Sequence, residues 1–502
     1  VNQAIWTHRM HHVRARMVVL NRLLYRGEVA VPPEGRQKLR WYGPGLMWML
    51  SAVGTGSILF TPRVASVYQY ELFWLLLLVV FFMWVMIREM ARFSIVTGRT
   101  VLEGIHTLGG PRGWAVWLIF VPQLLAAAVG IAGLSAVVGS SVQSFLPGSA
   151  TLFGIVLVVL CSGFVASGRY MLIERFSRVM ALLLMAMAVV SAVVIFPAPQ
   201  AVLSGLSPTI PNDPDLYVIL PWVGTILAGS MGIVWFGYWT AMRGFGGGLL
   251  SRDREEPLPE DAREAEHKTE LEPGTGEEYI ARARAWIRVV TGAATLGVVG
   301  GLVVIFAFMV LGAELLAPKG ILPEGSDVAV DLTRLFSEVW GTAGKYLLLG
   351  SIMIALGGSV LANQDGWGRS FADMTIILTR HKRDAERPGV MLGALDALQK
   401  ITGWQMRERR NVKRLFVATV TGLIPIIIIA LFSDPVKVMS ASGIIAAAHT
   451  PFIAFIALYV NRTRLPVALR PGWFITLSMA LAGLFYLGFA CVYLWDYFAG
   501  GS

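Results

Sequence analysis

His449 stands in the middle of a long apolar run, residues 436–460. An imidazole titrates near neutral pH, so a histidine in such a place can bind a metal ion or carry a proton. A histidine that only packs, with its ring nitrogens hydrogen-bonded inside the protein, fits the same pattern. The residue type alone leaves both interpretations open.

The first apolar run, residues 43–68, is interrupted near its middle by Gly54, Thr55, Gly56 and Ser57. Two glycines and two hydroxyls at this depth allow a helix to unwind and expose backbone carbonyls and amides. Such groups must be met by protein, water or a ligand, so an unwound stretch there lines a cavity. Glycines that only let helices pack closely are the alternative.

A second glycine-rich stretch lies in the sixth apolar run, residues 218–243. Its glycines alternate with large aromatic side chains, among them Trp235, Tyr238 and Trp239. If this helix also unwinds, the aromatic rings would form a wall against which a small organic solute could rest.

Charged side chains mark the ends of three runs. Arg88 and Glu89 lie near the end of the second, Asp365 and Arg369 close the eighth, and Glu174 opens the fifth. Such residues could form salt-bridged gates or a proton path. The alternative is that they are ordinary interfacial charges that reach water.

The elements that must carry these residues are eleven long apolar runs. With 55% hydrophobic and 15% charged residues and a mean hydropathy of +0.63, the chain is too apolar for a soluble protein. Each run is long enough to cross a hydrocarbon core of roughly 30 Å as a helix. We therefore expect one all-α domain that crosses the lipid bilayer about eleven times. The expected spans are residues 43–68, 72–97, 113–139, 151–168, 170–196, 218–243, 285–316, 340–363, 413–432, 436–460 and 471–497.

The spacing of the two interrupted runs predicts a repeat. Runs 1 and 6 are five helices apart, as expected if two inverted five-helix repeats place a substrate site at their interface. This arrangement favours a secondary transporter that works by alternating access.

The positive charges predict how the chain lies in the membrane. Lys and Arg gather in alternate polar gaps, which places the amino terminus in the cytoplasm and the carboxyl terminus outside. We expect a plasma-membrane protein with a basic cytoplasmic extension over residues 1–40 and a transporter domain over residues 41–502. Two cytoplasmic polar loops are expected at residues 246–284 and 364–412.

Other function classes find no support in the sequence. The net charge of +10 lies in the short gaps and not on one face, so we expect no nucleic-acid partner. Cys161 and Cys491 have no metal-ligand spacing. No HExxH motif, paired carboxylates or Ser/His pair at usable spacing appears, so we expect neither an enzyme nor a bound cofactor. The oligomeric state is not predicted.

Several short motifs, taken in order, resemble the Nramp family of metal-ion transporters, whose fold is the LeuT type with two inverted five-helix repeats. The resemblance covers most of the chain, from Gly43 to about Arg464. Its pieces are GPG at 43–45, YQYELFW at 68–74, TG at 97–98, Tyr170 with Glu174, GLSPTIP at 205–211 and HTPFIAFIALY at 449–459. The resemblance implies a secondary carrier of divalent cations, with proton coupling as a further expectation.

The chain departs from the family where metal ligands are expected. The family's DPGN corresponds to Gly54, Thr55, Gly56 and Ser57, so the carboxylate is absent. The family's MPH is placed at residues 233–235, beginning with Ile233 and ending with Trp235. Its tenth-helix glutamine is replaced by His449.

These departures leave three kinds of cargo open. A cation such as Mg²⁺ could be held through its waters, because it dehydrates reluctantly. A metal ion could instead use other ligands, of which His449 is the best candidate, or the cargo could be a small organic solute. A membrane sensor or partner-binding protein that no longer transports is the alternative outside this class.

Overall fold

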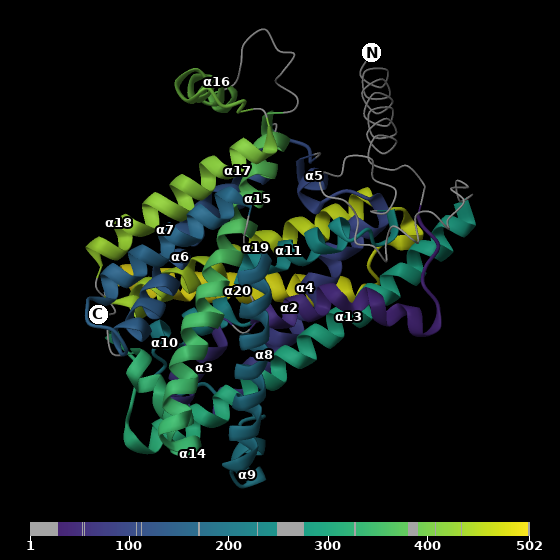
Figure 1. The fold of residues 1–502 in the computed structure, drawn as a ribbon. Coiled ribbons are helices and arrows are strands. Elements are labelled where there is room, and N and C mark those ends of the chain that lie inside the picture. Colours follow the sequence, from purple (N-terminus) through teal and green to yellow (C-terminus); the bar gives the residue numbers. More distant parts are fainter. Residues whose placement is uncertain are drawn as a thin grey trace, which may run out of the picture.

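The computed structural model is built from helices that follow the apolar runs (Figure 1). It describes residues 29–247, 276–379 and 390–499, apart from residues 53, 55, 107, 112, 169–170, 228, 326–327, 407 and 433. Within these residues, ten helices are long and apolar enough to cross a membrane. Each overlaps one of the expected spans. The remaining span, residues 43–68, is the first broken helix.

The main bundle consists of long helices, some of which are halves of one interrupted span. They are α2 (Gly43–Ala52), α3 (Thr61–Tyr68), α4 (Phe73–Thr97), α6 (Trp114–Gln143), α7 (Ala150–Ser167), α8 (Met171–Val194), α10 (Leu216–Thr225), α11 (Gly229–Met242), α13 (Gly276–Leu311), α14 (Val328–Ser351), α15 (Gly357–Thr379), α17 (Arg409–Ala418), α18 (Ile424–Leu431), α19 (Pro435–Arg464) and α20 (Trp473–Ala499). The shorter helices α5 (Val101–His106), α9 (Pro199–Ser204) and α16 (Val390–Thr402) lie in the connections.

Helices extend into both expected polar loops. Helix α13 already begins at Gly276, inside the first loop, and α15 continues to Thr379, inside the second. In both places, a helix with polar side chains extends beyond the apolar stretch, because helical hydrogen bonds do not require apolar residues. Figure 1 shows α16 beyond the ends of α15 and α17, outside the main bundle.

Part of the expected amino-terminal extension packs on the bundle. The indole of Trp286 in α13 donates a 2.8 Å hydrogen bond to the carbonyl of Ala30, and Val29 and Ala30 are both buried. Residues 1–28, like most of the 246–284 segment, lie outside the described residues. The described part of the extension is therefore anchored to α13.

Candidate functional site

Both helices expected to break do so. Helix α2 ends at Ala52, and the chain resumes at Gly56 as the π-helical turn η2 (Gly56–Phe60), which leads into α3. Helix α10 ends at Thr225 and α11 begins at Gly229. Between them Leu227 has a φ of 66°, in the left-handed region that a branched side chain rarely adopts. The backbone leaves the helical path at both places.

The halves of the two broken helices are joined crosswise. The indole of Trp48 in α2 donates to the carbonyl of Gly232 in α11, at 3.4 Å. The indole of Trp222 in α10 donates to Thr61 of α3 at 3.0 Å, and the Thr61 hydroxyl donates to the carbonyl of Gly56 at 2.7 Å. The hydrogen bonds therefore tie α2 to α11 and α3 to α10.

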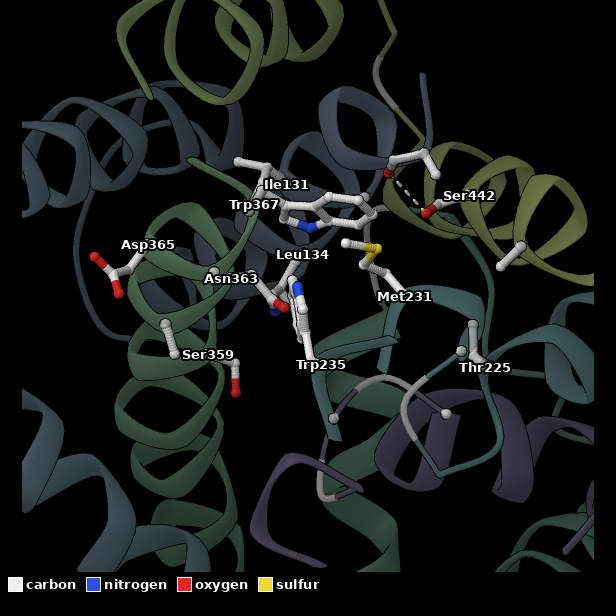
Figure 2. Close-up of a pocket in the computed structure, with 18 of the residues that line it drawn as sticks. Ile131, Leu134, Thr225, Met231, Trp235, Ser359, Asn363, Asp365, Trp367 and Ser442 are labelled. Atoms are coloured by element: carbon white, nitrogen blue, oxygen red, sulfur yellow. Dashed lines mark hydrogen bonds between the residues drawn. The ribbon is translucent and has the colours of Figure 1, made fainter. Parts of the chain in front are cut away.

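A cavity of about 510 Å³ lies where the two breaks meet. Its wall includes Gly54 and Gly56 from the first break and Thr225 and Gly229 from the second. Most of the remaining lining comes from α6, α8, α11, α15 and α19, so residues from both repeats line it. Figure 2 shows Met231, Trp235, Asn363 and Trp367 converging on its centre.

Aromatic rings form one wall of this cavity. The ring of Trp235 lies 5.4 Å from that of Trp367, at an interplanar angle of 72°, and 6.4 Å from that of Trp239. The Trp235 indole donates to the hydroxyl of Ser370 at 2.9 Å, which fixes the ring against α15. Trp235 and Tyr238 both line the cavity, as the aromatic pattern predicts.

The carboxylate of Asp365 at the cavity wall is held by cations. Arg369 donates to its Oδ2 at 2.8 Å, and Lys413 of α17 pairs with its Oδ1. In Figure 2 the carboxylate points away from Trp235 and Met231. Nearby, Arg409 of α17 bonds both Asp373, at 2.5 Å, and the hydroxyl of Tyr238. These contacts link α15 and α11 to α17.

His449 is not at the cavity surface. The residue is 2% exposed, and it is absent from the lining residues. Its Nε2 lies 3.1 Å from the carbonyl oxygen of Leu118, and its Nδ1 lies 2.6 Å from the amide nitrogen of Gln123. Both ring nitrogens therefore have partners inside the protein, and the ring does not face the cavity. Its hydrogen-bond partner Gln123 does line the cavity.

The other expected binding residues divide into three groups. Gly54, Gly56, Trp235 and Tyr238 line the cavity. Ser57 and Ile233 are buried but absent from its lining, because η2 and α11 direct their side chains elsewhere. The second break lies between Thr225 and Gly229, about one helical turn before Ile233, where the resemblance places the first residue of the MPH motif. Thr55 lies outside the described residues.

The expected gating residues are similarly divided. Asp365 and Arg369 line the cavity. Glu89 is fully buried away from it, accepts from Arg92 at 2.7 Å and 3.0 Å, and lies 3.6 Å from Arg88. This cluster also accepts a hydrogen bond from Asn461, so it joins α4 to α19. Glu174 lies in α8, but its side chain is outside the described part of the structure.

The lining residues that sequence reasoning missed include Gln123, Met231, Asn363 and Trp367. Gln123 could have been found, because it is an uncharged polar side chain within an apolar run and follows Pro122. Asn363 stands at the end of its expected span, next to the expected loop. Nothing in the sequence distinguishes Met231 from an ordinary packing methionine.

Comparisons with solved structures agree with this architecture. A mutant of the Eremococcus coleocola manganese transporter aligns with a TM-score of 0.56 at 12% identity, covering 95% of this chain and 93% of that one. The same transporter in complex with an aromatic bis-isothiourea substituted compound gives a TM-score of 0.53 at 14% identity, covering 95% and 92%. These similarities extend over almost the entire length of both chains, and they establish the LeuT-type fold.

The comparison with family models identifies the chain more specifically. No curated protein matches it. The model for Nramp, natural resistance-associated macrophage protein-like, matches residues 45–362, which include both helix breaks and most of the cavity wall. This match covers more than half of the 502 residues, and the protein therefore belongs to the Nramp family.

Proposed function

We propose that this protein is a secondary transporter that moves its cargo by alternating access through the cavity between the two helix breaks. The observation that carries this proposal is the meeting of both breaks at one cavity of about 510 Å³. Unwound backbone at membrane depth is tolerated where it lines a cavity, and carriers with inverted repeats bind their substrates at such places.

We propose a divalent metal cation as the cargo, carried with part of its water shell. Family membership and the manganese transporters among the solved relatives support the metal. The donor set supports retained water, because among the described residues no three His, Cys, Asp or Glu side chains come together. The Asp365 carboxylate is already held by Arg369 and Lys413. Removing all water from a divalent ion needs anionic or soft ligands in compensation.

A small organic solute is the second candidate, favoured by the aromatic wall. Trp235, Trp239 and Trp367 offer flat apolar surface, and the cavity volume is within the usual range for small-molecule sites, roughly 300–1,000 Å³. Hydroxyl and amide groups at Ser230, Ser442, Gln123 and Asn363 would orient such a molecule.

The proposed topology places the amino terminus in the cytoplasm of a plasma-membrane protein. In that orientation the cavity extends toward the cytoplasm, since its lining includes Ser177 and Arg178 in the first half of α8 and Arg369 and Ser370 in the second half of α15. The opposite end is held together by Arg63, which pairs with Glu324 at 2.8 Å, and by Tyr70, which donates to Glu314 at 3.0 Å. These contacts would have to break when the carrier opens to the opposite side of the membrane.

Uptake into proteoliposomes tests the proposal. The purified full chain is reconstituted, and entry of Mg²⁺ and Mn²⁺ is followed with an internal fluorescent indicator, with and without a pH gradient. Saturable metal uptake above empty liposomes supports the metal carrier, and its dependence on the gradient reports proton coupling. If neither ion enters while a panel of aromatic and amine solutes does, the organic candidate replaces it.

A further inference from the structure

The amide of Gln123 has an orientation that its neighbours determine. The Leu118 carbonyl can only accept, so the Nε2 of His449, 3.1 Å away, must carry the ring proton. The Nδ1 of the neutral ring is then a lone-pair acceptor, and only a donor can face it at 2.6 Å. The NH₂ group of Gln123 therefore points at His449, and its carbonyl oxygen points away.

Both amide protons of Gln123 are used. The same nitrogen lies 2.9 Å from the hydroxyl oxygen of Ser230 and 2.6 Å from the Nδ1 of His449. The carbonyl oxygen Oε1 is buried and has no hydrogen-bond partner among the described residues. Leaving a buried acceptor unpaired costs free energy, so such a group calls for a partner. Gln123 and Ser230 both belong to the cavity wall.

We propose that Gln123 Oε1, positioned by His449, accepts a hydrogen bond from the cargo in the cavity. This inference rests on the proposed transport function and adds to it the chemistry that the cargo must present: N–H or O–H donors. Two sources meet that requirement, the water shell of a metal cation and the ammonium or amide group of an organic solute.

The neighbouring side chains favour a donor that carries positive charge. The faces of Trp235 and Trp367 attract cations, and Met231 adds a polarisable sulfur at the same centre (Figure 2). His449 makes no contact with the cargo in this arrangement. Its role is to hold the amide nitrogen of Gln123 toward His449, so that the carbonyl oxygen is left for the cargo.

The test is binding of four probes to the purified full chain by calorimetry. Hexaamminecobalt(III) exposes only N–H donors and exchanges no ligands, so it mimics a hydrated cation. Mn²⁺ can shed its water, methylammonium has N–H donors on an organic cation, and tetramethylammonium has the charge without the donors. Hexaamminecobalt(III) and methylammonium thereby distinguish the two sources.

The key variant is Gln123→Met, which keeps the length of the side chain and removes the acceptor. For the donor-bearing probe that the unaltered protein binds, we expect this variant to lower the affinity by about tenfold or more. That is the usual effect of losing a hydrogen bond to a charged donor. Tetramethylammonium binding should change less than about threefold. Gln123→Glu, which keeps an acceptor, should retain binding and remains informative if Gln123→Met fails to fold.

His449 is tested as a positioning residue. His449→Phe should lower the affinity for the same probe as much as Gln123→Met does. The double variant should lower it no further, because the two residues act through one hydrogen bond. His449→Gln, whose carbonyl can accept from Gln123, should restore binding. Ser135→Ala is the matched control, since Ser135 is also in α6 and its buried oxygen has no hydrogen-bond partner within the described part of the chain, but it is absent from the cavity lining.

Two results would overturn the inference while leaving transport intact. The first is donor-probe binding by Gln123→Met equal to that of the unaltered protein. The second is an equal loss of all probes, tetramethylammonium included, which would mean a collapsed cavity and no specific acceptor. Absence of uptake by the unaltered protein in proteoliposomes would instead contradict the proposed function itself.

Discussion

The Nδ1 of His449 lies 2.6 Å from the amide nitrogen of Gln123, so the histidine faces a neighbouring helix and not the cavity. An intramembrane histidine is often a ligand or proton carrier. In this protein one ring nitrogen accepts from a side chain and the other donates to a backbone carbonyl. Its contribution to the site is the orientation of Gln123.

Replacing His449 by Gln should therefore leave Mn²⁺ affinity within about twofold, as glutamine supplies the same acceptor without an imidazole. Calorimetry on the purified variant measures this directly. A loss of tenfold or more would mean that the imidazole itself binds the metal.

Adding a carboxylate to the cavity should create a tighter metal site. Gly54 lines the cavity, so Gly54→Asp would place an anionic oxygen ligand at the first helix break, and we expect Mn²⁺ affinity to rise by about tenfold or more. Ser57→Asn is the matched control. Ser57 is buried and absent from the lining, so this change should add no affinity. A comparable gain from Ser57→Asn alone would contradict the geometry.

Glu89 should prove to be a structural residue and not a gate. Glu89→Gln leaves the buried Arg92 without its counter-charge, and we expect a loss of about 3–5 kcal/mol in stability, seen as a lower unfolding temperature in detergent. Glu278→Gln removes an ion pair from a side chain that is 53% exposed, and should cost less than about 1 kcal/mol. Unchanged stability of Glu89→Gln with altered transport kinetics would restore the gating role.

The first break should depend on the absence of a side chain at Gly56. A Cβ there would lie 2.3 Å from the carbonyl oxygen of Thr225, where α10 ends. Because that neighbour is backbone, we expect Gly56→Ala to destabilise the protein by about 1–3 kcal/mol. Gly163→Ala in α7 meets nothing within 4 Å and should be neutral or slightly stabilising. Equal unfolding temperatures for the two variants would show that the breaks do not pack as described.

The sequence predicted the membrane-spanning bundle and both helix breaks, since each depends on local composition. Long apolar runs define the spans, and glycines near Gly54 and Gly229 mark where the helices unwind. The register within α11 was not predictable in the same way. Ile233 and Trp235 are two residues apart on one helix, and only packing decides that Ile233 is buried in the core while Trp235 reaches the cavity.

The polar side of the site depended on contacts between distant segments. Gln123, the partner of His449, lies 326 residues away in α6. Lys413, one partner of Asp365, lies in another helix. Neither pairing leaves a trace in the local sequence. Gln123 is noticeable in the sequence as a glutamine within an apolar run. The orientation of its amide follows only from the three-dimensional arrangement of Leu118, His449 and Ser230.

The measurement that tests the central claim most directly is metal uptake by proteoliposomes when the cavity is filled. Ala362→Trp places a large side chain on the α15 wall of the cavity, and an unchanged unfolding temperature would verify that the variant is folded. We expect the unaltered protein to accumulate Mg²⁺ or Mn²⁺ and the folded Ala362→Trp variant to lose this uptake. Equal uptake by both proteins would contradict transport through this cavity.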